Sequence, residues 1–143
     1  SRLINPCDAP CILQGIFHPP YSHLHQEAAQ LLDYQNLGVI KGEGGEIERN
    51  PDNALTVFHC SLGEVSQQEW PALFPRRHVN AQQLSAEHMV SVWKGETDDE
   101  YAEGAILSTC ALALKQLDHG LNQTAAIEKE TELWTSRNLS QLG

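Results

Sequence analysis

The segment with the clearest chemical potential is the acidic, glycine-rich run from Lys41 to Asp52. It combines three glycines with three glutamates: Gly42, Gly44, Gly45, Glu43, Glu46 and Glu48. Glycines allow backbone amides to approach a ligand closely, whereas the carboxylates would repel a bare phosphate. A Mg²⁺ ion between the carboxylates and a diphosphate would resolve that conflict. The alternative is a solvated acidic turn without a ligand, and the residues alone leave both interpretations open.

Basic side chains that could contact phosphate are few. Lys41 and Arg49 flank the loop, and Arg76, Arg77 and His78 form the one basic cluster in the sequence. Arg76 and Arg77 could equally lie in a solvated turn. The chain has 9 Lys plus Arg against 19 Asp plus Glu, for a net charge of -10. That balance disfavours a generic nucleic-acid or anionic-membrane binder, so such a role would depend on a local patch.

The cysteines and histidines give weaker signals. Cys7, Cys11, His18 and His23 contain acceptable zinc-ligand pairs, but the join between the pairs is too short for a zinc finger. We therefore expect buried thiols and helix-start histidines rather than a metal site. Neither a Gly-x-Ser-x-Gly elbow nor a Walker loop occurs, and we assign no catalytic residue. The four scattered cysteines are typical of reduced thiols in a cytoplasmic protein.

These residues need a scaffold, and the first 84 residues predict an α/β segment. Apolar runs at 11–17, 37–41 and 54–60 indicate strands. Between the first two, a helix is predicted over 21–35, with Leu24, Ala28, Leu31 and Leu32 on its inward face. This order favours a parallel βαβ unit, with the glycine-rich loop leaving the carboxyl end of its second strand. The third strand and the segment around Gly63 predict an edge hairpin.

Residues 85–143 predict three closing helices on the same core. Ser85 caps the first, which Gly95 ends. A capping box at Thr97 and Glu100 predicts the start of a long, largely buried helix that runs to His119. The last helix starts at Asn122 or Thr124 and runs to about Asn138. We expect its inward residues to be Ile127, Leu133 and Trp134. Two residues of the preceding helices, Trp93 and Ile106, are expected in the core as well.

Length and composition fit one globular domain. The chain has 143 residues, and 41% of them are hydrophobic, enough for a core without disulfides or a structural metal. Its most apolar candidate span, 105–114, is interrupted by Ser108 and Thr109, so we expect no membrane insertion.

The order of several short motifs resembles the C-terminal part of anthranilate phosphoribosyltransferase and its relatives, glycosyltransferase family 3. The matching elements are Leu3–Pro6, the strand and turn Leu13–Pro19, the strand end Lys41–Gly45, Lys94–Glu96, and the alanine-rich stretch after Glu103. The resemblance implies the C-terminal part of a phosphoribosyltransferase-like α/β domain, preceded by a further N-terminal portion. It also implies that the 143-residue chain alone transfers nothing. An apolar face exposed where the preceding portion would dock predicts self-association into a homo-oligomer such as a dimer.

The loop departs from the enzyme pattern His-Gly-x-Asp-Gly-x-Asp-Glu, whose acidic pair holds Mg²⁺ for phosphoribosyl pyrophosphate. Lys41 stands at the histidine position, and Ile47-Glu48 replaces the acidic pair. Glu46 could substitute only if the backbone shifted. The loop is more similar to that of the YbiB-type paralogues, which are regarded as DNA-binding.

Three hypotheses follow from this resemblance. One is a transferase that uses Mg²⁺ through Glu48 and Glu46. The second, which we prefer, is a binder of single-stranded nucleic acid through Lys41, Arg49, Arg76 and Arg77 in the full-length protein. The third is a purely structural portion whose ligand site requires the preceding half.

Overall fold

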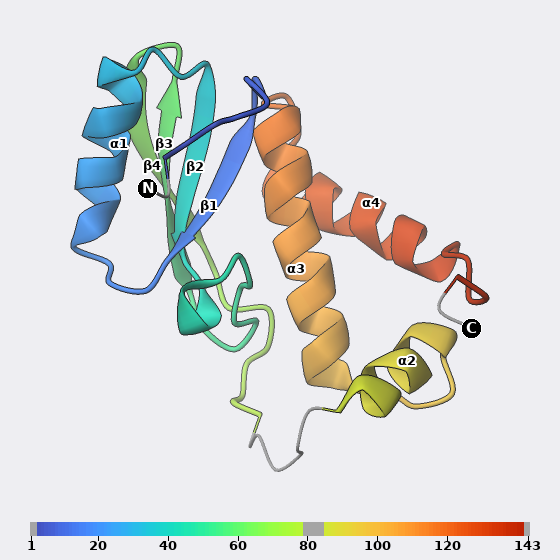
Figure 1. Cartoon of the computed structure of the whole chain (residues 1–143). Coiled ribbons are helices and arrows are strands. Elements are labelled where there is room, and N and C mark those ends of the chain that lie inside the picture. The colour runs from blue at the N-terminus through green and yellow to red at the C-terminus, as the bar shows by residue number, and fades with distance from the viewer. Residues whose placement is uncertain (1–2, 79–84, 142–143) are drawn as a thin grey trace.

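The computed structural model describes residues 3–78 and 85–141 and has a mixed α/β architecture (Figure 1). In chain order its elements are β1 (Ile12–Ile16), α1 (Tyr21–Leu31), β2 (Asn36–Lys41), the short 3-10 helix η1 (Glu43–Gly45), β3 (Leu55–Ser61), β4 (Glu64–Trp70), α2 (Ala86–Lys94), α3 (Glu100–Leu117) and α4 (Gln123–Thr135).

The four strands form one sheet in the order β1-β2-β3-β4. β1 and β2 are parallel, and Ile16 at the end of β1 pairs with Lys41 at the end of β2. β3 runs antiparallel to both β2 and β4. Leu62 and Gly63 make the tight turn between β3 and β4, both with positive φ. The predicted βαβ unit and the edge hairpin are therefore confirmed.

The sheet is covered on both faces (Figure 1). On one face α1 packs through Ala29 against a cluster that includes Leu37, Val39 and Cys60. On the other face, residues of α3 and α4 join Ile40, Leu55, Val57 and Trp70 in a second cluster. Neighbouring residues of β2 thus belong to different clusters, as the alternation of side chains along a strand requires. α3 and α4 therefore share a core with the sheet, whereas, among the residues that the structure describes, α2 contributes none to either cluster.

The predicted inward face of α1 is wrong. Leu24, Leu31 and Leu32 are exposed, Leu31 by 86%. The helix instead buries Ser22, Gln26 and Ala29 and ends at Leu31, four residues before the predicted end at position 35. Gln26 explains this orientation, because its side-chain amide donates to the carbonyls of His59 (2.7 Å) and Ser66 (2.9 Å). Small and polar residues thus face the sheet, and an apolar stripe faces outward.

The closing helices follow the predicted order, with corrected ends. Ser85 caps α2, and Gly95 ends it in the left-handed conformation. The capping box at Thr97 is wrong, because Asp99 is the N-cap of α3 and accepts from the backbone N–H of Ala102. Thr97 instead exchanges a hydrogen bond with Ser91.

The burial of the closing helices also differs from the expectation. α3 ends at Leu117, before His119, and buries one stripe, which contains Gly104, Ala105, Ser108, Ala111, Leu112 and Gln116. Among its other residues only Glu100, Ile106 and Leu117 are exposed, and the rest are half-buried. Ile106 on α3 and Leu133 on α4 are exposed, so their predicted inward positions are wrong. Asn122 caps α4, which ends at Thr135 rather than near Asn138. None of the described helices is long and apolar enough to cross a bilayer.

Candidate functional site

A cavity of about 250 Å³ lies where the carboxyl end of β2 meets the start of α1. Its walls come from the start of α1, the end of β2, the turn before β3, and β3 itself: Pro19, Ser22, Lys41, Arg49, Asn50, Asn53, Ala54, Leu55, Thr56 and Phe58. We call it the Lys41 pocket. The carboxyl ends of strands in α/β sheets are where ligands usually bind.

Glycines shape the loop that borders this pocket. A Cβ atom on Gly42 would lie 1.6 Å from the carbonyl oxygen of Glu46, and one on Gly15 would lie 2.2 Å from the same atom. The loop backbone therefore crosses the ends of β1 and β2 at a distance that only glycine permits. Gly44 and Gly45 have φ values of 60° and 82°, which turn the loop back. The three loop glycines therefore allow the turn itself and the close approach of the loop backbone to the strand ends.

Arg49 is the most unusual residue of the pocket, because its guanidinium is buried with only 1% of the residue exposed. It donates to the carbonyl of Pro71 and lies 5.5 Å from the centre of the Trp70 ring. Its Nε has no hydrogen-bond partner, and none of the ion pairs between described side chains involves it. Burial lowers the pKa of Arg49 to about 10, so the group stays positively charged at neutral pH.

The structure brings only some of the predicted cations together. Lys41 is exposed at the end of β2 and lines the pocket with Arg49. Arg77 lies beside the pocket, where its Nη2 is 3.5 Å from the Oδ1 of Asn53. Arg76 instead forms an exposed ion pair with Glu100 at 2.9 Å, away from the residues that line the pocket. Two cations thus line the pocket and a third lies beside it, an arrangement that would attract an anion.

The predicted metal ligands lie outside this pocket. The side chains of Glu46 and Glu48 are exposed, and neither residue lines it. Within the described part of the chain, no three His, Cys, Asp or Glu residues are grouped so that they could hold a metal ion. The residues therefore do not fit a preformed Mg²⁺ site. The four cysteines are free, and burial raises the thiol pKa of Cys11, Cys60 and Cys110.

Sequence reasoning missed Asn50 and Asn53, which give the pocket its uncharged polar groups. The backbone N–H of Asp52 donates to the Oδ1 of Asn50 at 2.9 Å. This bond to the backbone two residues further on defines an Asx turn. The signal was present as Asn50-Pro-Asp-Asn53, a run of turn-forming residues directly before a strand.

Comparison with known proteins gives partial matches. No known family model matches the chain. It is 37% identical to anthranilate phosphoribosyltransferase of Cupriavidus metallidurans over 67 residues, which cover 47% of this chain and 20% of that protein. It is 31% identical to anthranilate phosphoribosyltransferase of Paracidovorax citrulli over 102 residues, or 66% of this chain and 30% of that protein.

A third relative, anthranilate phosphoribosyltransferase of Polaromonas sp., is 34% identical over 67 residues, which cover 47% of this chain and 19% of that protein. The chain thus spans between a fifth and a third of the length of these curated relatives. The matches support the resemblance to glycosyltransferase family 3.

Proposed function

We propose that this chain is the C-terminal portion of a glycosyltransferase-family-3 protein of the YbiB type, in which the Lys41 pocket binds a phosphate group of single-stranded nucleic acid. The observation that carries the proposal is the buried charge of Arg49, which has no carboxylate partner among the described residues. A buried cation is costly unless an opposite charge compensates it. A bound phosphate, held also by Lys41 at the pocket wall, would supply that charge.

Nucleic acid fits the pocket better than a metal-bound diphosphate. A phosphodiester carries one negative charge and can be bound by cations and amide groups without a metal ion. The pocket offers Lys41, Arg49, Asn50 and Asn53, and no carboxylate is among the residues that line it. Because the chain has a net charge of -10, most of the affinity must come from a preceding portion or a partner subunit.

The test is a fluorescence-anisotropy titration of the full-length protein with a labelled oligothymidylate at several salt concentrations. We expect binding that weakens as the salt concentration rises. Lys41→Ala should lower the affinity, and it should reduce the slope of log affinity against log salt concentration by about one, the loss of one phosphate contact. Lys129→Ala is the matched control, since Lys129 is exposed on α4, which contributes no residue to the pocket. Absence of binding at low salt, or equal effects of the two variants, would contradict the proposal.

A second function is favoured by the relatives, all of which are named anthranilate phosphoribosyltransferase. A transferase would need Mg²⁺ and phosphoribosyl pyrophosphate; Glu48 and Glu46 are the exposed loop carboxylates that the metal would have to use, although they do not form a preformed site. The full-length protein would then be stabilised by phosphoribosyl pyrophosphate only when Mg²⁺ is present, and Glu48→Gln would abolish that stabilisation. The 143-residue chain alone should transfer no phosphoribosyl group to anthranilate.

A further inference from the structure

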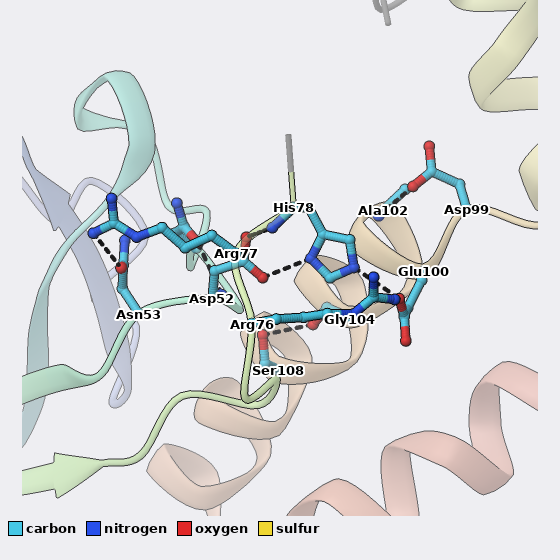
Figure 2. A network of polar contacts seen from close by, with 11 residues as sticks. Asp52, Asn53, Arg76, Arg77, His78, Asp99, Glu100, Ala102, Gly104 and Ser108 are labelled. Atoms are coloured by element: carbon cyan, nitrogen blue, oxygen red, sulfur yellow. Dashed lines mark hydrogen bonds and ion pairs between the residues drawn. The ribbon is translucent and has the colours of Figure 1, made fainter. Parts of the chain in front are cut away.

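Residues 71–78, which follow β4, hold the turn that forms one wall of the Lys41 pocket, and Figure 2 shows His78 bonded to Asp52 of that turn. The backbone N–H of Leu73 donates to the carbonyl of Pro51 at 2.8 Å. The backbone N–H of His78 donates to the Oδ2 of Asp52 at 2.7 Å. Pro51 and Asp52 lie between the wall residues Asn50 and Asn53, so these bonds tie that wall to residues 71–78.

His78 connects this turn to α3 through both of its ring nitrogens. Nδ1 lies 2.7 Å from the Oδ1 of Asp52, and Nε2 lies 2.8 Å from the Oε2 of Glu100 at the start of α3. A neutral imidazole carries one N–H and can donate to one carboxylate, whereas the imidazolium donates to both. The Asp52 side chain is 6% exposed and that of His78 is 16% exposed, so water competes little for the inner bond.

The groups around the ring favour its protonated form. From the pocket turn Asp52 faces the ring, and from α3 Glu100 faces it, with the ring of Tyr101 5.8 Å away. The segment of His78 itself contributes Arg76, which pairs with Glu100, and Arg77, which lies against Asn53 rather than the imidazole.

We propose that His78 is a positioning residue whose protonation clamps the wall of the Lys41 pocket to α3, and that loss of the proton loosens the wall and weakens anion binding. The second half of this statement rests on the proposed anion-binding function. The clamp itself does not depend on which ligand binds, because His78 holds the wall of the pocket and does not contact the bound group.

The direction of the pH dependence follows from the hydrogen bonds. The bonds to Glu100 and then to Asp52 raise the pKa of His78 above its ordinary value, against the opposing effect of burial. The pKa of Glu100 is lowered, first by its bond to His78. Burial would raise the pKa of Asp52, but the bonds from His78 together lower it. The clamp is therefore closed in mildly acidic solution, below the ordinary histidine pKa, and is lost as the pH rises through the raised pKa.

The experiment follows the clamp and the pocket separately on the 143-residue chain. Ring-proton NMR gives the pKa of His78, and hydrogen exchange of the amides in the turn 50–53 reports whether the wall is held. Sulfate is the binding probe, because its charge stays constant between about pH 6 and pH 9. His78→Gln removes the titrating group. His88→Gln is the matched control, since His88 pairs with Asp99 at 2.8 Å and does not touch the pocket turn.

We expect a raised His78 pKa, faster exchange in the turn above it, and a loss of sulfate affinity of about threefold to tenfold over the same range. His78→Gln should exchange fast and bind weakly at every pH, whereas His88→Gln should behave like the unmodified chain. A His78 pKa at or below its ordinary value, or exchange in His78→Gln that equals that of the unmodified chain, would overturn the clamp. If sulfate fails to bind at every pH while the exchange result holds, the anion-binding function fails and the clamp stands.

Discussion

Replacement of Arg49 by methionine tests whether Arg49 serves to bind a ligand or to stabilise the fold. Burial lowers the pKa of Arg49 to about 10. At this pKa the guanidinium binds its proton more than a hundredfold more weakly than an exposed arginine does. The difference corresponds to a cost of about 3 kcal/mol for keeping the charge buried. The substitution removes that cost. It also removes the hydrogen bond to Pro71 and the contact with Trp70, which together contribute about 2 to 3 kcal/mol.

The two effects nearly cancel, so Arg49→Met should change the free energy of unfolding by less than about 1 kcal/mol. It should lower the affinity for sulfate by about tenfold or more, because the methionine offers no charge to the anion. Chemical denaturation measures the first quantity, and a sulfate titration followed by NMR measures the second. Both use the 143-residue chain.

Arg137→Met is the matched control, because Arg137 has the partners that Arg49 lacks. It donates to the carbonyls of Trp93 (2.8 Å) and Trp134 (2.7 Å) and stacks 3.6 Å from the Trp134 ring. We expect it to lose about 2 kcal/mol or more of stability without a change in sulfate affinity. Arg49 is structural rather than ligand-binding if Arg49→Met is destabilised as much as Arg137→Met while its sulfate affinity is unchanged.

Three further predictions concern the scaffold. Gly42→Ala should lower the free energy of unfolding by about 1 to 3 kcal/mol, since its Cβ would collide with the Glu46 carbonyl. Gly44→Ala is the control, because its new Cβ meets nothing within 4 Å. It should lose only about 1 kcal/mol, the cost of a positive φ. Asp99→Ala should cost about 0.5 to 2 kcal/mol in thermal or chemical unfolding by removing the α3 cap, and a larger effect of Thr97→Ala would contradict the observed cap. Self-association through the outer face of α1 should appear in light scattering at high concentration and diminish in Leu31→Gln, whereas an unmodified chain that is monomeric at every concentration would refute it.

The strands, the parallel βαβ unit and the hairpin could be predicted because β-branched runs, helical spacing and turn residues mark them locally. The orientation of α1 could not, because it depends on where Gln26 finds two carbonyl partners, one on β3 and one on β4, and helical spacing carries no such information. Asp99 displaced Thr97 as the cap since both residues suit that position and the tertiary contact with His88 favours the aspartate.

Two of the predicted site residues, Lys41 and Arg49, line the pocket, whereas the predicted glutamates do not. The glycine-rich loop at the end of a parallel strand indicated the pocket region, and Lys41 lies there. The burial of Arg49 could not be foreseen, because it results from packing against β4 and the segment that follows, far away in sequence. The bond between Asp52 and His78 joins residues 26 positions apart and leaves no local signal.

The most direct test of the central claim is an NMR titration of the 143-residue chain with inorganic phosphate, read at every assigned backbone amide. The proposal predicts that the largest shifts occur at the residues around the Lys41 pocket, namely Lys41, Arg49, Asn50 and Asn53, and at the start of α1 near Ser22. Shifts centred instead on exposed cations elsewhere, such as Lys129 on α4, or the absence of any saturable shift, would contradict it.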